Sequence, residues 1–337
     1  MQLEPITDKQ RWEAVVSTFP EANFLQSWNW GVFQQSLSKQ VTRLAVLNQN
    51  KVVGLFQTVL EPASRGPYLS IAGGPLLDWH QAEVVAYVFA ACKQLAKEQG
   101  AWFIRFRPQE VESVALEQTV AAVGARSAPM HLTADLTLQL QLAASEDELL
   151  AQMRKNHRNL IRRAERDGIT TTVSQDSAEI QQFYDWQCYL AEKHGFVPFS
   201  KRFLRNQFEA FAADDQVLLI HSFMEDQLLA SAFVIFYNGE AIYHYGISTP
   251  TNEKIPGSYA VQWRAIQEAK ARGCQRYNFW GIAPEQDKNH RFAGVSMFKR
   301  GFGGQEVAYL PAHDVPVSPL YWGTYVFEQL RRRYRKL

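Results

Sequence analysis

One order of elements occurs in both halves of the chain and limits the folds that it can adopt. In the first half, an amphipathic helix is expected over residues 81–99, stops before a glycine, and is followed by a short strand in residues 101–107. In the second half, a helix over residues 257–272 also stops before a glycine, and a short strand follows at residues 276–279. A chain of 337 residues is long enough for about two domains. The pattern therefore predicts a fold that is built twice, without a repeat of the sequence itself.

Strands precede the helix in each half, and further helices are expected between them. The alternation of apolar and polar residues predicts strands over 41–47, 51–60, 133–142, 216–223, 227–237 and 240–247, and helices over 178–194 and 201–212. Asn238-Gly239 is a strong signal for a tight hairpin between the last two strands. This content predicts the α/β (α+β) class, with mixed but mostly antiparallel sheets that are flanked by helices.

A helix start marks the expected domain boundary. Ser145 can cap a helix, and Glu148 stands three residues later, which is the spacing of a capping box. We therefore expect a first domain over residues 1–144 and a second domain over residues 145–316.

Composition excludes several classes of protein. The net charge is +1, which argues against a wholesale binder of polyanions but allows a local basic face. Three widely spaced cysteines and the lack of an HExxH pattern argue against a disulfide framework and a zinc site, and we expect no metal. The polar N-terminus is unlike a signal peptide, and the longest apolar run, 84–92, is too short to span a membrane. We expect a cytoplasmic protein.

The last residues of the chain, 331–336, are strongly basic. Their cations suit the negative end of a helix dipole, and this reading requires no partner. The alternative is peripheral contact with anionic lipid headgroups at the inner face of a membrane.

A basic helix is expected over residues 146–167. Arg154, Arg158 and Arg162 follow one another at intervals of four residues, on the side opposite to an apolar stripe. Like charges at this spacing repel one another, and an anionic partner such as a phosphate would relieve the repulsion. The alternative is a solvated helix face that pairs with acidic residues elsewhere in the fold.

A glycine-rich segment over residues 296–304 combines Phe298, Lys299 and Arg300 with three glycines. Glycine lets a ligand approach the backbone, and a lysine at such a place can neutralise a phosphate or a developing oxyanion. The alternative is a turn with a surface lysine. The spacing is neither that of a Walker loop nor that of a dinucleotide-binding fingerprint.

An aromatic strand end, Tyr243-His244-Tyr245-Gly246, precedes a helix that opens after Pro256-Gly257-Ser258. The free N–H groups of such a helix start can bind an anion or a carbonyl oxygen. An ordinary strand-to-helix junction explains the same pattern.

Four motifs, in order, resemble the Fem (FemABX) family of peptidoglycan-bridge aminoacyltransferases. They are Phe24-Leu25-Gln26-Ser27-Trp28, the basic helix from Arg158 to Gly168, Phe298-Lys299-x-x-Phe302-Gly303-Gly304, and the tail Tyr309-Leu310-Pro311-Ala312-His313-Asp314 with Ser318-Pro319-Leu320-Tyr321. The resemblance implies two tandem GNAT-like acyltransferase domains, with a C-terminal helix, about 317–337, returning to the first. The helical-hairpin arm of larger members is absent, because the basic helix runs straight on to Gly168.

The resemblance also implies a reaction and its residues. Members transfer an amino acid from aminoacyl-tRNA to an amine on a peptidoglycan precursor that carries a diphosphate, either lipid II or a UDP-linked muropeptide. Lys299 and Phe298 fall on the essential FK motif, and Arg158 and Arg162 fall on positions that contact the precursor. We add Arg154, Tyr245 and Trp28 as expected substrate-binding residues. Some members place a phosphate-binding lysine near residues 30–35, where this chain has Phe33 and Gln34 and its next lysine is Lys39.

The implied chemistry is aminolysis of an ester. The amine of the substrate is the nucleophile, so the chain needs no serine or cysteine nucleophile and no cofactor. Asp287, His290 and the carboxylates of the substrate itself are the candidate bases. Two alternatives are an acyl-CoA-dependent N-acyltransferase of the same fold and a non-catalytic binder of nucleic acid or anionic lipid. In the second alternative, Trp280 and Phe302 would serve as stacking platforms.

Overall fold

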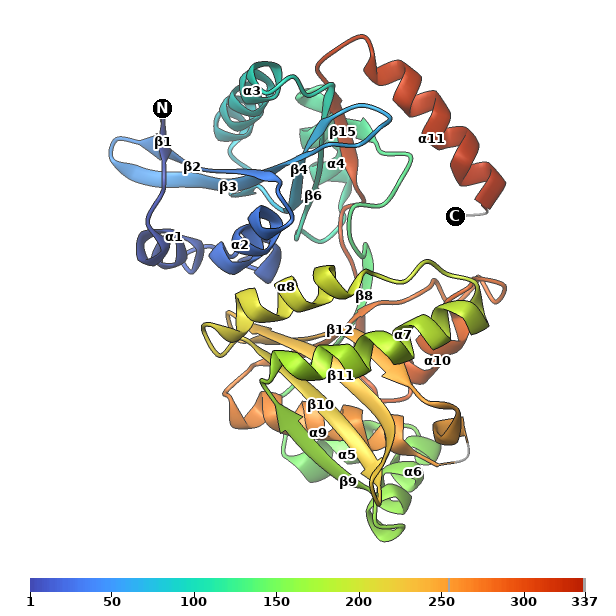
Figure 1. Cartoon of the computed structure of the whole chain (residues 1–337). Helices are drawn as coiled ribbons and strands as arrows, with labels where there is room; N and C mark the ends of the chain where they lie inside the picture. Colours follow the sequence, from blue (N-terminus) through green and yellow to red (C-terminus); the bar gives the residue numbers. More distant parts are fainter. Residues whose placement is uncertain (254, 336–337) are drawn as a thin grey trace. The chain divides into compact units, whose positions relative to one another are not determined.

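The computed structural model describes residues 1–253 and 255–335, and the chain forms two compact units (Figure 1). The first unit comprises residues 1–135 together with the chain from Ala308 onward, and the second comprises Leu136–Val307. Each unit consists of one twisted sheet with helices packed against it.

The first unit contains an eight-stranded sheet with the order β1-β2-β3-β4-β6-β15-β7, in which β5 pairs with β3. All neighbouring strands are antiparallel except β4 and β6, which are parallel. The bounds are β1 Gln2–Pro5, β2 Gln40–Asn48, β3 Lys51–Glu61, β4 Tyr68–Gly73, β5 Leu76–Leu77, β6 Phe103–Pro108, β7 Arg126–Ser127 and β15 His313–Pro316. The helices are α1 Lys9–Val16, α2 Trp28–Ser36, α3 Ala82–Glu98, α4 Val114–Ala122 and α11 Tyr321–Arg335.

The second unit contains a seven-stranded sheet with the order β14-β8-β13-β12-β11-β10-β9. The bounds are β8 Leu136–Gln141, β9 Thr170–Ser174, β10 Val217–Met224, β11 Gln227–Tyr237, β12 Glu240–Ser248, β13 Arg276–Gly281 and β14 Gln305–Ala308. The helices are α5 Glu146–Gln152, α6 Lys155–Arg166, α7 Ile180–His194, α8 Lys201–Ala212, α9 Gly257–Ala271 and α10 Ala293–Arg300. Within this unit, α7 and α8 cover one face of the sheet, and α9 with α5 and α6 covers the other (Figure 1).

The predicted duplication is confirmed by the topology. In the first unit α3 ends before Gly100, whose φ is +69°, and leads into β6, which lies parallel to β4. In the second unit α9 ends before Gly273, whose φ is +73°, and leads into β13, which lies parallel to β12. The left-handed conformation that ends each helix suits glycine, because a Cβ would be strained there. The predicted mixed α/β class is therefore confirmed as well.

The boundary between the units differs from the expected one. β8 lies before residue 144 but pairs with β13, so it belongs to the second unit. β15 lies before residue 317 but pairs with β6 and β7, so it belongs to the first unit. Long-range strand pairing decides both assignments, and the local pattern of a strand does not reveal its partner.

We expected one long helix over residues 146–167, and this prediction is wrong in one respect. The segment forms two helices. α5 ends at Gln152, and Met153 and Arg154 have extended backbones with ψ of 156° and 142° before α6 begins. The capping box at Ser145 and Glu148 is present as predicted. α6 ends at Arg166 and β9 begins at Thr170, so the predicted lack of a helical-hairpin arm at this point is confirmed.

A buried ion network holds α11 against the first unit. The guanidinium of Arg105 donates to both carboxylate oxygens of Asp314, at 2.7 and 2.8 Å, and to Glu328 of α11 at 2.7 Å. All three side chains are almost fully buried. The two carboxylates and the guanidinium compensate one another, so removing one of them would leave a buried charge without its partner.

Within residues 1–253 and 255–335, every helix is too short or too polar to cross a bilayer.

Replacing Arg105 by alanine should lower the free energy of unfolding by about 3–5 kcal/mol, because two buried carboxylates would lose their partner. Urea unfolding followed by tryptophan fluorescence measures this. The matched control is Arg65→Ala, since Arg65 reaches the same Glu328 at 3.7 Å from a more exposed position. The control should lose less than about 1 kcal/mol. Equal losses in the two variants would contradict the role of the network.

Candidate functional site

The candidate site lies in the second unit, where the parallel strands β12 and β13 part. Their pairing covers only Glu240–Ile242 with Arg276–Asn278 and then ends. The pairing of β13 with β8 is also irregular here, with a register shift between Asn278 and Gly281. Trp280 lies in this irregularity with a φ of +61°, which is unusual for a bulky side chain. Such strain is typical of functional sites.

Side chains hold this irregular strand end in place. The backbone N–H of Trp280 donates to Oδ1 of Asn278 at 2.8 Å. The side-chain amide of Asn278 donates in turn to Glu240 at 3.0 Å, and both residues are buried. Hydrogen bonds to side chains therefore hold β13 between Asn278 and Gly281, where its pairing with β8 is interrupted.

Lys299 of α10 reaches this place from the glycine-rich segment. Its Nζ donates to the carbonyl of Gly281 at 2.8 Å and lies 5.6 Å from the centre of the Tyr243 ring. The residue is only 8% exposed, so the expected alternative of a surface lysine is wrong. Burial lowers the pKa of Lys299 to about 7, because the charged form loses its hydration. The group can therefore gain or lose a proton near neutral pH.

Phe298 packs against a histidine that the sequence analysis did not single out. His157 of α6 is buried, and its ring contacts the rings of Phe298, Tyr259 and Phe302 at centroid distances of 4.9–6.0 Å. Its Nε2 lies 2.9 Å from the carbonyl of Phe298. A carbonyl only accepts, so Nε2 carries the proton. Burial lowers the pKa of His157, which favours the neutral ring.

Two glycines of the segment allow neighbouring elements to pack closely. A Cβ on Gly301 would lie 1.9 Å from the ring of His157, and a Cβ on Gly304 would lie 2.4 Å from the carbonyl of Gln139 in β8. The carbonyl of Gly301 also accepts the backbone N–H of Arg154 at 2.9 Å. Close contact with α6 and β8 accounts for these two glycines without a ligand.

The three predicted arginines differ in their surroundings. Arg154 and Arg162 are exposed, and within the described residues neither forms an ion pair. Arg158 is half-buried, and its Nη1 donates to the carbonyls of Ala151 and Met153 at 2.8 Å each. Arg158 therefore satisfies the last carbonyls of α5, where a helix end has no partners of its own.

Tyr245 lies on the other face of the sheet from the ring of Tyr243. A bulge in the pairing of β11 and β12 places Tyr245 opposite Phe233 and Tyr243 opposite Val234, with His244 between them. The Tyr245 hydroxyl donates to Gln207 of α8 at 3.1 Å. The structure therefore places Lys299 beside Tyr243 and leaves Tyr245 on the other face. Phe298, the neighbour of Lys299 in the sequence, packs against His157 instead.

Trp28 belongs to the first unit and has structural contacts. The guanidinium carbon of Arg43 lies 3.8 Å above its ring, and Arg43 also donates to the Trp28 carbonyl at 3.1 Å. The ammonium group of Lys39 also has partners, because it forms an ion pair with Glu61 at 2.8 Å and donates to the side chain of Gln34 at 3.0 Å.

The other candidate residues from the sequence lie in the segment before α10 or in the core. Asp287 is exposed and His290 is half-buried, in the segment between β13 and α10. Phe302 is fully buried in the core, so the expectation that it offers a stacking platform is wrong. Within the described residues, no group of three or more metal-binding side chains occurs.

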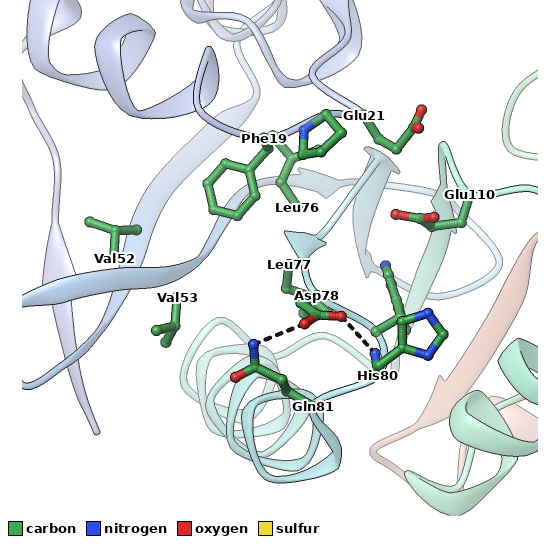
Figure 2. Close-up of a pocket in the computed structure, with 12 residues that line it drawn as sticks. Phe19, Glu21, Val52, Val53, Leu76, Leu77, Asp78, His80, Gln81 and Glu110 are labelled. Atoms are coloured by element: carbon green, nitrogen blue, oxygen red, sulfur yellow. Dashed lines mark hydrogen bonds between the residues drawn. The ribbon is translucent and has the colours of Figure 1, made fainter.

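A separate pocket of about 400 Å³ lies in the first unit, beside β5 and the start of β3 (Figure 2). Apolar side chains form most of its lining, and Glu21, Asp78 and Glu110 are the acids among its polar lining residues. Burial, together with the charges of Glu21 and Asp78, raises the pKa of Glu110 to about 7. The sequence analysis did not find this pocket, because its lining comes from four separate segments.

Replacing Gly301 by alanine should displace the His157 ring and lower the free energy of unfolding by about 1–3 kcal/mol, because the added methyl has no room. Thermal unfolding measures this. Gly294→Ala, within α10, is the matched control, since nothing lies within 4 Å of its added Cβ. Its stability should stay within about 1 kcal/mol of the parent. A tolerated Gly301→Ala would contradict the close packing of α10 on α6.

Replacing Glu110 by glutamine should stabilise the protein by about 1 kcal/mol at pH 8, a figure reduced for solvent screening. The pKa of this acid is raised on folding, so its charged form is unfavourable in the folded protein above pH 7. The gain should vanish as the pH falls from about 7 toward 4.5, where the carboxyl becomes neutral in both states. Denaturation at several pH values measures the difference, and a gain that is independent of pH would contradict this assignment.

Comparison with known proteins identifies the family. Residues 7–223 and 219–329 match the model of the FemAB family. The chain is 33% identical over 94 residues to aminoacyltransferase FemA of Staphylococcus epidermidis, covering 28% of this chain and 22% of that protein. It is 34% identical over 98 residues to FemA of Staphylococcus aureus (strain MW2), covering 28% of this chain and 23% of that protein. The matched region is thus less than a quarter of the length of these curated relatives.

Solved structures agree on the fold. A crystal structure of FemX superposes with a TM-score of 0.86 at 19% identity, over 98% of this chain and 100% of that chain. A tandem GNAT protein from the clavulanic acid biosynthesis pathway superposes with a TM-score of 0.61 at 10% identity, over 94% of this chain and 99% of that chain. These likenesses confirm the predicted tandem GNAT-like fold. Since the family model covers most of its length, the chain belongs to the FemAB family.

Proposed function

We propose that this protein is an aminoacyltransferase that moves an amino acid from aminoacyl-tRNA to an amine of a peptidoglycan precursor. The match of nearly the whole chain to the FemAB family carries the proposal, and the relatives named aminoacyltransferase FemA support it. The acceptor would carry a diphosphate, as a lipid-linked or UDP-linked muropeptide. The reaction would take place in the cytoplasm, where charged tRNA occurs, and it needs no cofactor because the ester is already activated.

In this proposal Lys299 stabilises negative charge. The amine of the acceptor attacks the ester carbonyl, and the carbonyl oxygen becomes an oxyanion before the tRNA hydroxyl leaves with a proton. A buried cation acts strongly on such a charge, because little water is present to screen it. The pKa of Lys299 is about 7 without a ligand, and an anion beside it would raise that pKa and favour the ammonium form.

Arg154, the N-cap residue of α6, and Arg162 within α6 would bind the diphosphate of the precursor. Arg154 and Arg162 carry charges that no acid within the described residues neutralises, and guanidinium groups suit bidentate contacts to phosphate. Arg158 lies between them in the sequence, in the first part of α6, and would add its positive charge. His157 links this helix to the FK motif through its contact with Phe298.

Replacing Lys299 by methionine should lower the single-turnover rate of transfer by about 10²- to 10³-fold, because the oxyanion loses its cation. The assay uses total charged tRNA with both precursor types and detects the product by mass spectrometry. Lys288→Met is the matched control, since Lys288 is exposed, and its rate should not change.

The stability of the Lys299→Met variant shows whether a change in its transfer rate could come from unfolding. Since burial lowers the pKa of Lys299, the charged lysine destabilises the folded protein below pH 7, and this cost disappears as the pH rises toward 10.5. The variant should therefore be at least as stable as the parent at pH 6. An unchanged transfer rate in a folded variant would remove Lys299 from the mechanism.

Replacing both Arg154 and Arg162 by alanine should weaken precursor binding by roughly tenfold or more, because charge-assisted hydrogen bonds to phosphate are lost. Calorimetric titration with a UDP-linked muropeptide measures this at two salt concentrations. Arg163→Ala is the control, since Arg163 pairs with Asp167 at 2.9 Å. Equal affinity of the parent for the precursor with and without its diphosphate would contradict the assignment.

The fold likeness to a tandem GNAT protein favours an acyl-CoA-dependent N-acyltransferase as the second candidate. The same transfer assay with acetyl-CoA in place of charged tRNA separates the two. Product from acetyl-CoA alone would support the second candidate, and product from charged tRNA alone would support the first. Binding of both substrates without any product would support a non-catalytic role.

A further inference from the structure

The two faces of α11 are reversed relative to an ordinary surface helix. The inward face is polar over most of its length: Thr324 is 5% exposed and donates to the carbonyl of Arg65, and Glu328 is 3% exposed and pairs with Arg105. Tyr321, at the start of the helix, is its fully buried aromatic residue. The face toward solvent is apolar. A surface helix usually buries its apolar side, so burial in the fold does not account for the apolar side of α11.

Five large side chains form this outer α11 face: Trp322, Val326, Phe327, Leu330 and Tyr334. Four of them follow at intervals of four residues, and Phe327 lies beside that row, so they share one side of the helix. Their exposed fractions run from 45% to 90%. Single exposed hydrophobics are ordinary, but a continuous stripe of this kind marks an interaction surface.

Positive charges surround the outer α11 face. The guanidinium carbon of Arg126 lies 4.4 Å from the Trp322 ring, and that of Arg65 lies 5.6 Å from the Phe327 ring. Arg332 and Arg333 are exposed near the end of the helix. The acid within the helix, Glu328, points inward to Arg105. Lys336, the last cation of the predicted basic tail, lies outside the described residues.

We propose that the outer α11 face binds the surface of an anionic phospholipid bilayer, with the helix lying flat in the interface. Apolar side chains would enter the boundary of the acyl chains, and arginines would meet the negative headgroups. Trp322 and Tyr334, near the two ends of the helix, are of the types that favour this interface.

Charge selects this occupant over a second copy of the chain. A two-fold pairing of outer α11 faces would bring the arginines of both copies together, and like charges would repel. An anionic bilayer neutralises the same arginines. The proposal goes beyond the transfer reaction, and it holds or fails independently of it.

Flotation of the full chain with vesicles tests the proposal. The protein should float with vesicles of phosphatidylcholine and phosphatidylglycerol at 3:1, and should float far less with phosphatidylcholine alone. Added salt should weaken the binding, because it screens the arginines. Equal binding to both vesicle types, or to neither, would overturn the proposal.

Two sets of variants locate the binding surface. Phe327→Ser with Leu330→Ser should weaken binding to anionic vesicles by about tenfold or more, since two apolar groups no longer leave water. Arg332→Gln with Arg333→Gln should weaken it by on the order of fivefold for each charge. Val111→Ser with Val114→Ser is the matched control, because these valines are 62% and 75% exposed in the same unit, and binding should not change.

The expected melting temperatures of all these variants equal that of the parent, since the residues are exposed. Vesicle binding that survives both α11 double substitutions would overturn the proposal. A dimer in light scattering that the α11 substitutions dissociate, without lipid binding by the parent, would also overturn it and would assign the face to self-association.

Discussion

The hydrogen bond from Nζ of Lys299 to the carbonyl of Gly281 is the interaction on which the candidate site depends. That carbonyl is available because β13 leaves its regular pairing between Asn278 and Gly281, and β12 has already parted from it. The left-handed backbone of Trp280 is the cost of this irregularity. A lysine that is buried beside a single carbonyl and an aromatic ring is easily neutralised, so the same burial that destabilises its charge prepares it to respond to an anion.

The helix α6 connects this lysine to the exposed positive charge of the second unit. Its inner side carries His157, which contacts Phe298 and fits against Gly301. Its outer side carries Arg162, and Arg154 is its N-cap residue. One helix therefore sets the position of the FK motif and presents the arginines. Arg158 has a further task, because it binds the carbonyls at the end of α5 and so fixes the break between the two helices.

Local patterns predicted the helices that end in glycine, the Asn238-Gly239 hairpin and the longer strands of both sheets, because each depends on neighbours in the sequence. The short strands, such as β1, β7 and β15, were not predicted, because two to four residues carry too little alternation. Features that depend on distant partners were not predictable in this way. The apolar stripe of residues 146–167 continues across Met153, so nothing local announced the break, and alternation alone could not assign β8 to the second unit. A bulge at His244 turned Tyr245 away from Tyr243, although their spacing in an unbroken strand predicts a shared face. His157 was present in the basic helix, but only the fold shows that it lies under the FK motif.

The attachment of α11 relies mainly on buried polar contacts, and Tyr321 at its start is its fully buried aromatic residue. Arg105, Asp314 and Glu328 form a buried network, and burying such charges brings less net stability than packing hydrophobic residues of similar volume. The helix nevertheless fixes its orientation through these polar contacts and leaves Trp322, Phe327 and Leu330 in solvent. The buried contacts of Thr324 and Glu328 specify one orientation of the helix. That orientation keeps an apolar surface with arginines beside it available to a partner outside the fold.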